Sequence, residues 1–439
     1  MNLLFLSYRV SLTRALPISI YNYFDMISLF AGKLVVILSW IFVWNIRVVN
    51  GEDPLLEWDL TIEERVQKHG YPIRTHQIET DDGYYNSLYN IPYGLNGKHK
   101  DTKNKSNVLI AHGMGGSPHN FIVLGVEGSA PYYFANKGLN VWLFAARGSD
   151  GSFQKKHKFW DWEKDTQYWN YCMHEIGKYD LAAAIDFIYN QTGNKVAVVG
   201  HSAGGNELHI LLSERPEYSS KMSVGINWGS SPIIRLLDSP LWLFGTLLVD
   251  IWKAIAKYGN FKEVPRVQTF RPVLKKMCSD PGWQKVCTMT TWVIGSQRSR
   301  VQHPDVIRLL TSNIPRLSSR MVFQFCDNIN AGVFSQYDFG TKGNLKRYGQ
   351  KRPPKYHLNN TMTPIAFFVG PGDRVVPRSD VCEAVKQIGN PVLVYDIPFD
   401  KYSHTDFILG HNSSELVYKP TYELIRDIDA GNFTKDVNC

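Results

Sequence analysis

The stretch formed by residues 195–207, KVAVVGHSAGGNE, decides the fold of this chain. Its apolar half, residues 196–199, is typical of a buried strand and runs into the pattern G-x-S-x-G around Ser202. Helix-forming residues follow at 207–214. A serine on so sharp a strand-to-helix turn has strained backbone angles, and the glycines leave room for the neighbouring strand and helix. The stretch predicts a nucleophile at Ser202, although a structural serine in a tight turn is the alternative.

Length and composition indicate a chain with a large buried core, and the charge pattern gives no sign of a nucleic-acid partner. The 439 residues are 44% hydrophobic, which suffices for a sizeable core, and one α/β domain with insertions can reach this length. The net charge is +8, but no Lys/Arg run or basic tail carries it. The surplus predicts either a solvated surface rich in lysine or a mild attraction to anionic lipid surfaces.

Residues 1–50 differ from the rest of the chain and are predicted to be an N-terminal extension with a signal peptide. Residues 34–44, LVVILSWIFVW, form an uncharged run behind Lys33 that is short for a bilayer span and typical of a secretory signal. Met26 would be a more ordinary start for such a signal. The alternative is an uncleaved signal anchor. A cleaved signal predicts a secreted or lysosomal protein of the secretory pathway, and an uncleaved anchor predicts a membrane-anchored one.

Sequons and cysteines are consistent with that pathway. The pattern N-x-S/T gives glycosylation candidates at Asn104, Asn190, Asn359, Asn412 and Asn432. Of the six cysteines, Cys278 and Cys287 are close together, though too far apart for a C-x-x-C motif. In an oxidising compartment they would form a local disulfide, and the alternative is two free thiols.

Strands alternate with helices in two parts of the chain, which predicts an α/β fold with a mostly parallel sheet and helices on both faces. The first part is 51–228 and the second is 331–439, with an insertion at 229–330 predicted to be a mainly helical cap or lid. Strands are expected at 108–111, 140–145, 196–199, 222–227, 364–369 and 392–397, a hairpin at 73–93, and helices at 60–69, 132–137, 173–190 and 415–428. Residues 240–256 are strongly apolar and predict either a buried helix or a cap helix that meets lipid.

A serine nucleophile needs a general base and an acid that orients the base. In a parallel sheet these groups come from loops after later strands. Asp373 follows the strand at 364–369, and His404 follows the strand at 392–397. The order Ser202, Asp373, His404 is the one expected of an α/β-hydrolase. Other candidates for the acid and the base are Asp396, Asp400, His357 and His411.

The oxyanion of such a reaction needs backbone N–H donors. We expect one from Ala203, at the start of the helix after the nucleophile. The second should come from the glycine-rich loop 112–116, HGMGG, where Met114 is the candidate. His112 and His201 are interpreted as packed, hydrogen-bonded histidines rather than as second bases.

Collinear motifs in this chain resemble those of the acid lipase family, which includes gastric and lysosomal acid lipases. The motifs are HGYP (69–72), DDGY (81–84), IPYG (91–94), HGM (112–114) with GS (116–117), VWL (141–143), RG (147–148), EI (175–176), KYDL (178–181), IDFI (185–188), Gly332 with Phe334, YDFG (337–340), GD (372–373) and HTDF (404–407). The resemblance spans residues 61–428.

The resemblance implies an α/β-hydrolase core with a cap and lid, and hydrolysis of triacylglycerols or cholesteryl esters at a lipid–water interface. It implies transient contact with a membrane or lipid-droplet surface, and it supports Ser202, Asp373 and His404 as a triad with donors at Met114 and Ala203. It also implies the Cys278–Cys287 disulfide. No cofactor, metal or protein partner is expected.

Three departures from the family pattern stand out. Ala203 replaces the usual glutamine after the nucleophile, and residues 144–149 (FAARGS) replace the usual GNSRGN. The insertion from 229 to 321 is the poorest match, and it leaves the substrate open. A carboxylesterase or transacylase acting on smaller esters is therefore a second hypothesis. A non-catalytic lipid-binding hydrolase homologue is a third, which a complete triad disfavours.

Overall fold

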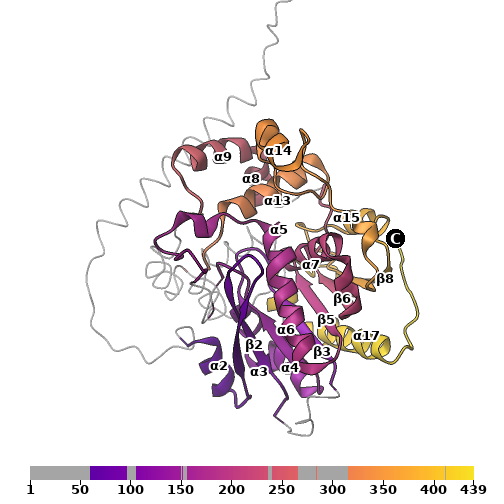
Figure 1. Ribbon diagram of the computed structural model, residues 1–439. Coiled ribbons are helices and arrows are strands. Elements are labelled where there is room, and N and C mark those ends of the chain that lie inside the picture. The colour runs from indigo at the N-terminus through magenta and orange to yellow at the C-terminus, as the bar shows by residue number, and fades with distance from the viewer. Residues whose placement is uncertain are drawn as a thin grey trace, which may run out of the picture. The chain divides into compact units, whose positions relative to one another are not determined.

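An eight-stranded sheet with the order β1-β2-β4-β3-β5-β6-β7-β8 organises the described part of the chain (Figure 1). This computed structural model describes residues 60–95, 105–149, 151, 156–235, 240–264, 283, 315–410 and 412–439. The strands are β1 (Arg74–Glu79), β2 (Tyr85–Ile91), β3 (Asn107–Ala111), β4 (Asn140–Phe144), β5 (Val196–His201), β6 (Met222–Trp228), β7 (Ile365–Val369) and β8 (Pro391–Asp396).

The sheet is parallel except at one edge, as the alternation of strands and helices predicts. The hairpin β1–β2 is antiparallel, and β2 pairs antiparallel with β4. All later pairings are parallel, with Val199 of β5 opposite Ile110 of β3 and Ile226 of β6. The central strands therefore end together beside the predicted nucleophile.

Helices cover both faces of the sheet, because successive strand residues point to opposite sides. Val198 packs in the same apolar cluster as Leu208 of α7. Its neighbour Val199 packs in the other cluster, with Phe134 of α4 and Leu424 of α17. The helices are α2 (Ile62–Lys68), α3 (Gly125–Gly128), α4 (Ala130–Asn136), α5 (Met173–Glu175), α6 (Ala182–Thr192), α7 (Ala203–Glu214), α8 (Pro240–Leu247), α9 (Val249–Tyr258), α13 (Ser319–Ala331), α14 (Gly340–Tyr348), α15 (Arg378–Val385), α16 (Asp406–Leu409) and α17 (Lys419–Asp429).

Two helices differ from the predicted ones for packing reasons. The helix expected at 173–190 contains a π-helical segment, Ile176–Leu181, between α5 and α6. There a Cβ on Gly177 would lie 2.9 Å from the Cβ of Ile210, so this glycine lets the segment approach α7 closely. Helix α7 begins at Ala203, four residues before the prediction. A Cβ on Gly205 would lie 2.6 Å from that of Ser230, so tight packing overrides the poor helix propensity of glycine.

The described part of the inserted segment contributes α8, α9 and most of α13, which lie together in Figure 1. Helix α13 separates two apolar clusters. Met321 and Phe325 join the core, whereas Phe323 and Cys326 pack with Val249 of α9. The apolar run at 240–256 forms two helices, and most residues of α9 are exposed, so the α9 part of the run is not a buried helix.

Several predictions fall on residues outside the described ranges. These are the signal or anchor at 1–50, the Cys278–Cys287 pair and the sequon at Asn104. Within the described ranges, no helix is both long and apolar enough to cross a membrane. The other four sequon asparagines are exposed, namely Asn190, Asn359, Asn412 and Asn432.

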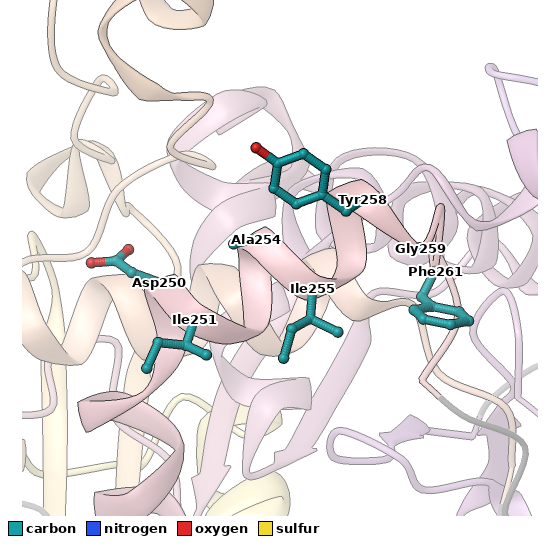
Figure 2. A pocket seen from close by; sticks show the side chains of 7 residues that line it. All are labelled: Asp250, Ile251, Ala254, Ile255, Tyr258, Gly259 and Phe261. Carbon is teal, nitrogen blue, oxygen red and sulfur yellow. The ribbon is translucent and has the colours of Figure 1, made fainter.

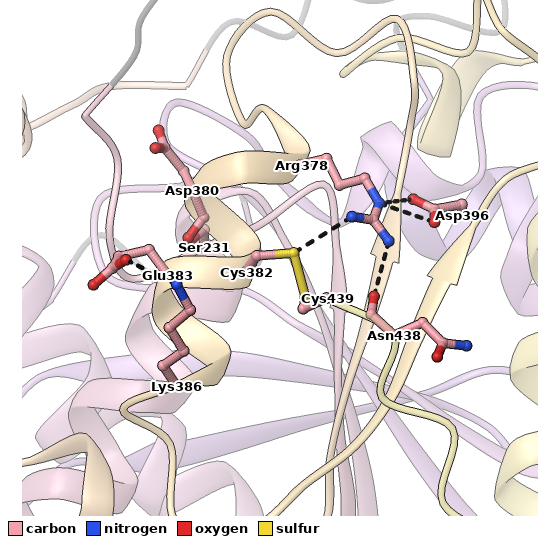
Figure 3. The surroundings of a disulfide bond; sticks show 9 residues. All are labelled: Ser231, Arg378, Asp380, Cys382, Glu383, Lys386, Asp396, Asn438 and Cys439. Carbon is pink, nitrogen blue, oxygen red and sulfur yellow. Dashed lines mark hydrogen bonds and ion pairs between the residues drawn. A yellow bond between two sulfur atoms is a disulfide. The ribbon is translucent and has the colours of Figure 1, made fainter.

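A disulfide that the sequence did not predict joins Cys382 of α15 to Cys439, across 57 residues and with the Cα atoms 5.3 Å apart (Figure 3). Arg378 supports it: its Nε donates to Asp396 at 2.8 Å, and its Nη2 donates to the carbonyl of Asn438 at 2.8 Å. The C-terminal tail is thus fixed to the β8 edge of the sheet. Sequence separation hides such a pair, because only neighbouring cysteines suggest a partner by spacing.

Candidate active site

Ser202 lies at the turn from β5 into α7 and has the strained backbone that its motif predicts. Its φ is 54° and its ψ is −122°, in a region that costs a side-chain-bearing residue about 1–3 kcal/mol. Its N–H donates to the carbonyl of Trp228 at 3.1 Å. A Cβ on Gly204 would lie 2.7 Å from the carbonyl oxygen of Ala111, so this glycine allows α7 to start against β3.

His404 and Asp373 meet Ser202 from two different loops. His404 Nε2 lies 2.9 Å from Ser202 Oγ, and His404 Nδ1 lies 2.9 Å from Asp373 Oδ2. A carboxylate can only accept, so Nδ1 carries the proton and Nε2 is left to accept from the serine hydroxyl. The structure therefore brings together three residues that are spread over 202 positions of the chain.

The carboxylate of Asp373 is buried and held in one orientation. Its Oδ1 accepts the N–H groups of Val375 and Val376 at 2.8 and 2.9 Å, which leaves Oδ2 for His404. Gly229, at the end of β6, has φ +51°, and a Cβ there would lie 3.1 Å from Asp373 Oδ2. The loop geometry thus leaves this carboxylate little freedom to turn.

The described rivals for the acid and the base lie away from Ser202. Asp396 pairs with Arg378 at the surface, at 2.8 Å. Asp400 and His357 are exposed, and His411 lies outside the described residues. Among the described candidates, only Asp373 and His404 form hydrogen bonds within the Ser202 cluster.

The predicted oxyanion donors border Ser202. Ala203 is the first residue of α7, and the first N–H groups of a helix have no partner inside it. The glycine loop of Met114 lies against the serine, because a Cβ on Gly113 would be 2.9 Å from the Cβ of Ser202. The positive end of the α7 dipole adds to the field at this point.

His112 and His201 are both buried and hydrogen-bonded. His201 Nε2 lies 3.0 Å from the backbone carbonyl of His404, so it donates to the loop that carries His404. Burial, with a smaller contribution from His404, lowers the pKa of His201 to about 3. Burial also lowers the pKa of His112 to about 4. Both rings are therefore neutral near pH 7.

A largely buried charge cluster around Arg147 was not predicted from the sequence. Arg147 Nη1 and Nη2 donate to Asp82 at 2.7 Å, and its Nε donates to Asp180 at 2.8 Å. Its guanidinium lies 3.8 Å from the ring centre of Tyr84. The motifs DDGY, RG and KYDL contain all four residues, but only the fold brings them together. No group of three His, Cys, Asp or Glu side chains in the described part of the chain could hold a metal ion.

An apolar hollow of about 640 Å³ lies along α9 (Figure 2). Ile251 and Ile255 project from one side of the helix, with Phe261 beyond its end. The hollow is lined by Asp250, Ile251, Ala254, Ile255, Tyr258, Gly259 and Phe261. Ile255 and Phe261 also line a second apolar cavity, of about 410 Å³, whose other walls include Phe323 and Cys326 of α13.

Fold and similarity together define the class of this protein, an α/β-hydrolase. Residues 107–231 match the alpha/beta hydrolase fold family, and residues 62–125 match the family described as a partial alpha/beta-hydrolase lipase region. Lipase 3 of Drosophila melanogaster is 30% identical, over 81% of this chain and 90% of its own length.

Two human proteins are similar over comparable spans. Lipase member K is 27% identical, over 86% of this chain and 93% of its own length. Lysosomal acid lipase/cholesteryl ester hydrolase is 26% identical, over 84% of this chain and 92% of its own length. The chain belongs to the acid lipase family and is a carboxylic ester hydrolase that acts on lipid esters.

Proposed function

We propose that this lipase cleaves triacylglycerols, cholesteryl esters or both, through Ser202, His404 and Asp373. The observation that carries the proposal is the pair of 2.9 Å contacts from His404, one to Ser202 Oγ and one to Asp373 Oδ2. A serine with an imidazole at hydrogen-bond distance, oriented by a buried carboxylate, is the arrangement that acyl transfer requires.

The proposed reaction proceeds through an acyl-enzyme. His404 Nε2 takes the proton of Ser202 as Oγ attacks the ester carbonyl, and then gives it to the leaving alcohol. Water, activated by the same imidazole, releases the fatty acid. Asp373 holds the ring and stabilises its charged form. The N–H groups of Met114 and Ala203 are proposed to bind the oxyanion in both halves of the reaction.

A lipid surface is the proposed partner of α8 and α9. Their exposed large apolar side chains, together with Phe261 just beyond α9, are Leu243, Leu247, Ile251, Trp252, Ile255, Tyr258 and Phe261. Large apolar side chains gathered on an exposed surface are typical of a site that contacts a partner or a membrane. The hollow along α9 and the inner cavity share Ile255 and Phe261, so lipid contact at the surface would adjoin an apolar interior.

The lipid-surface proposal is tested by Ile251→Glu combined with Ile255→Glu. We expect adsorption to triolein emulsion and hydrolysis of that emulsion to fall at least about tenfold, since two buried charges at an apolar interface are costly. Turnover of a soluble short-chain ester should stay the same. Phe159→Glu is the matched control, because Phe159 is 80% exposed at another place. Equal adsorption by the double variant and the parent protein would refute the assignment of this surface.

The secretory pathway, secreted or lysosomal, is the proposed location. The Cys382–Cys439 disulfide supports it, because such bonds persist in oxidising compartments. The exposed sequon asparagines are proposed glycosylation sites, and Cys278–Cys287 is a proposed second disulfide. We also propose 229–330 as the limits of the cap.

The catalytic proposal is tested by Ser202→Ala on emulsified triolein, emulsified cholesteryl oleate and a soluble short-chain ester. We expect activity on all three to fall by about 10⁴-fold or more. Ser213→Ala is the control, since Ser213 lies on the same helix and its hydroxyl accepts from the N–H of His357. Full turnover by the Ser202 variant would refute the nucleophile. Activity of the parent protein on the soluble ester alone would favour the carboxylesterase hypothesis, and no activity with any ester would favour a lipid carrier.

A further inference from the structure

Two hydrogen bonds fix the proton of His112. The N–H of Ala146 can only donate, and it lies 3.2 Å from His112 Nε2, so Nε2 carries no proton. The proton is therefore on Nδ1, which donates to the carbonyl of Gly113 at 2.9 Å. Burial keeps the ring neutral by lowering its pKa to about 4. The imidazole thus joins the end of β4 to the glycine loop.

The carbonyl that His112 holds belongs to the peptide whose N–H is that of Met114. The same carbonyl accepts the N–H of Gly116 at 3.0 Å. In a trans peptide the C=O and N–H point in opposite directions, and no described peptide bond is cis. Two donors on the Gly113 oxygen therefore also set the direction of the Met114 N–H.

This peptide borders the nucleophile. A Cβ on Gly113 would lie 2.9 Å from Ser202 Cβ and 3.3 Å from the carbonyl oxygen of His201. The missing side chain at Gly113 lets the loop lie this close to the serine, and the two hydrogen bonds to the Gly113 carbonyl oppose movement of this peptide.

Ala146, whose N–H donates to His112 Nε2, lies in a segment that further contacts hold in place. Ala146 precedes Arg147, whose N–H donates to Asp180 at 2.9 Å and whose guanidinium is bound by two buried or partly buried carboxylates. The ring of Phe144 is stacked over the imidazole, with centres 6.2 Å apart and planes at 20°. The charge cluster thus holds the segment whose Ala146 N–H is hydrogen-bonded to His112.

We infer that His112 is a positioning residue, which turns the Met114 N–H toward the oxyanion of the reaction proposed for Ser202. The inference rests on that proposed function. Its role is to hold one peptide in a preorganised direction, and it exchanges no proton with substrate. Hydrogen-bond donors preorganised in this way act on the transition state more than on substrate binding.

The test compares His112→Leu with His112→Asn. The asparagine amide nitrogen can stand where Nδ1 stands and donate to the Gly113 carbonyl, whereas leucine has no donor. We expect leucine to lower kcat by about 10- to 100-fold, as partial loss of an oxyanion donor would, with KM nearly unchanged. Asparagine should restore most of kcat. Affinity for an alkyl trifluoromethyl ketone, which forms a tetrahedral adduct with the serine, should fall in parallel with kcat.

The matched control is His209→Gln, since His209 is also buried but stacks on Phe367 in the core, with ring centres 5.9 Å apart. It should leave kcat and ketone affinity unchanged. If the leucine variant does not fold, His112→Gln takes its place as the variant without a donor to the Gly113 carbonyl. The glutamine side chain is longer, so its amide group reaches the position of Nε2 and not that of Nδ1. Equal kcat in the donor and non-donor variants would overturn the inference. Full activity of Ser202→Ala would instead overturn the proposed function, so the two failures are distinguishable.

Discussion

Replacing Asp373 by asparagine exchanges one carboxylate oxygen for an NH₂ group, and this tests the hydrogen-bond geometry of the site. Asp373 Oδ1 faces two N–H donors, from Val375 and Val376, and Oδ2 faces His404 Nδ1. An asparagine would place its oxygen toward the two N–H groups, because its NH₂ would meet donors there. Its NH₂ would then face Nδ1, which must accept. The proton would move to Nε2, which could no longer accept from Ser202.

A wrong tautomer of this kind lowers kcat by about 10⁴ in serine hydrolases, or about 5 kcal/mol of transition-state stabilisation. We expect a loss of that order for Asp373→Asn, measured as initial rates on a soluble ester, with KM nearly unchanged and the fold intact by circular dichroism. Asp396→Asn is the control, because that carboxylate pairs with Arg378 at the surface. A variant that kept more than about a tenth of the parent kcat would refute the tautomer argument.

Two further predictions concern stability. Replacing Cys382 and Cys439 by serine opens a loop of 57 residues, which should cost about 4 kcal/mol of unfolding free energy, and urea unfolding with and without reductant measures it. Burial and the nearby Asp180 raise the pKa of Glu207 well above 4.5, and its Oε2 has no partner among the described residues. The folded state then keeps a proton that the unfolded chain releases, so stability should fall as pH rises above about 4.5. Glu207→Gln should abolish that slope in urea unfolding from about pH 4 to about pH 7, and the exposed Glu415→Gln should not.

Most of the fold could be predicted from local patterns in the sequence. Alternating apolar runs predicted the strands and their mainly parallel order, because a buried strand is legible from a few consecutive residues. The motif around Ser202 predicted a strained turn, and the structure has φ 54° there. Sequence order also selected Asp373 and His404, since loops after parallel strands meet at one edge of the sheet.

Long-range pairings could not be predicted in this way. The charge cluster of Asp82, Arg147 and Asp180 needs three loops to converge, and the Cys382–Cys439 bond joins distant positions. The exposure of α9 also depends on the tertiary structure, because an apolar run has the same sequence pattern whether or not another element covers it.

The sequence by itself thus determined the α/β-hydrolase core, the family and the candidate nucleophile, acid and base, because these follow from short patterns and their order. Only the tertiary structure decided the roles of the buried polar side chains. His112 is a histidine beside a glycine in the sequence, and its partners Ala146 and Gly113 follow from the spacing of β3 and β4 in the sheet. Hydrogen-bond partners depend on distances of a few ångströms between segments far apart in the chain, and no local pattern encodes them.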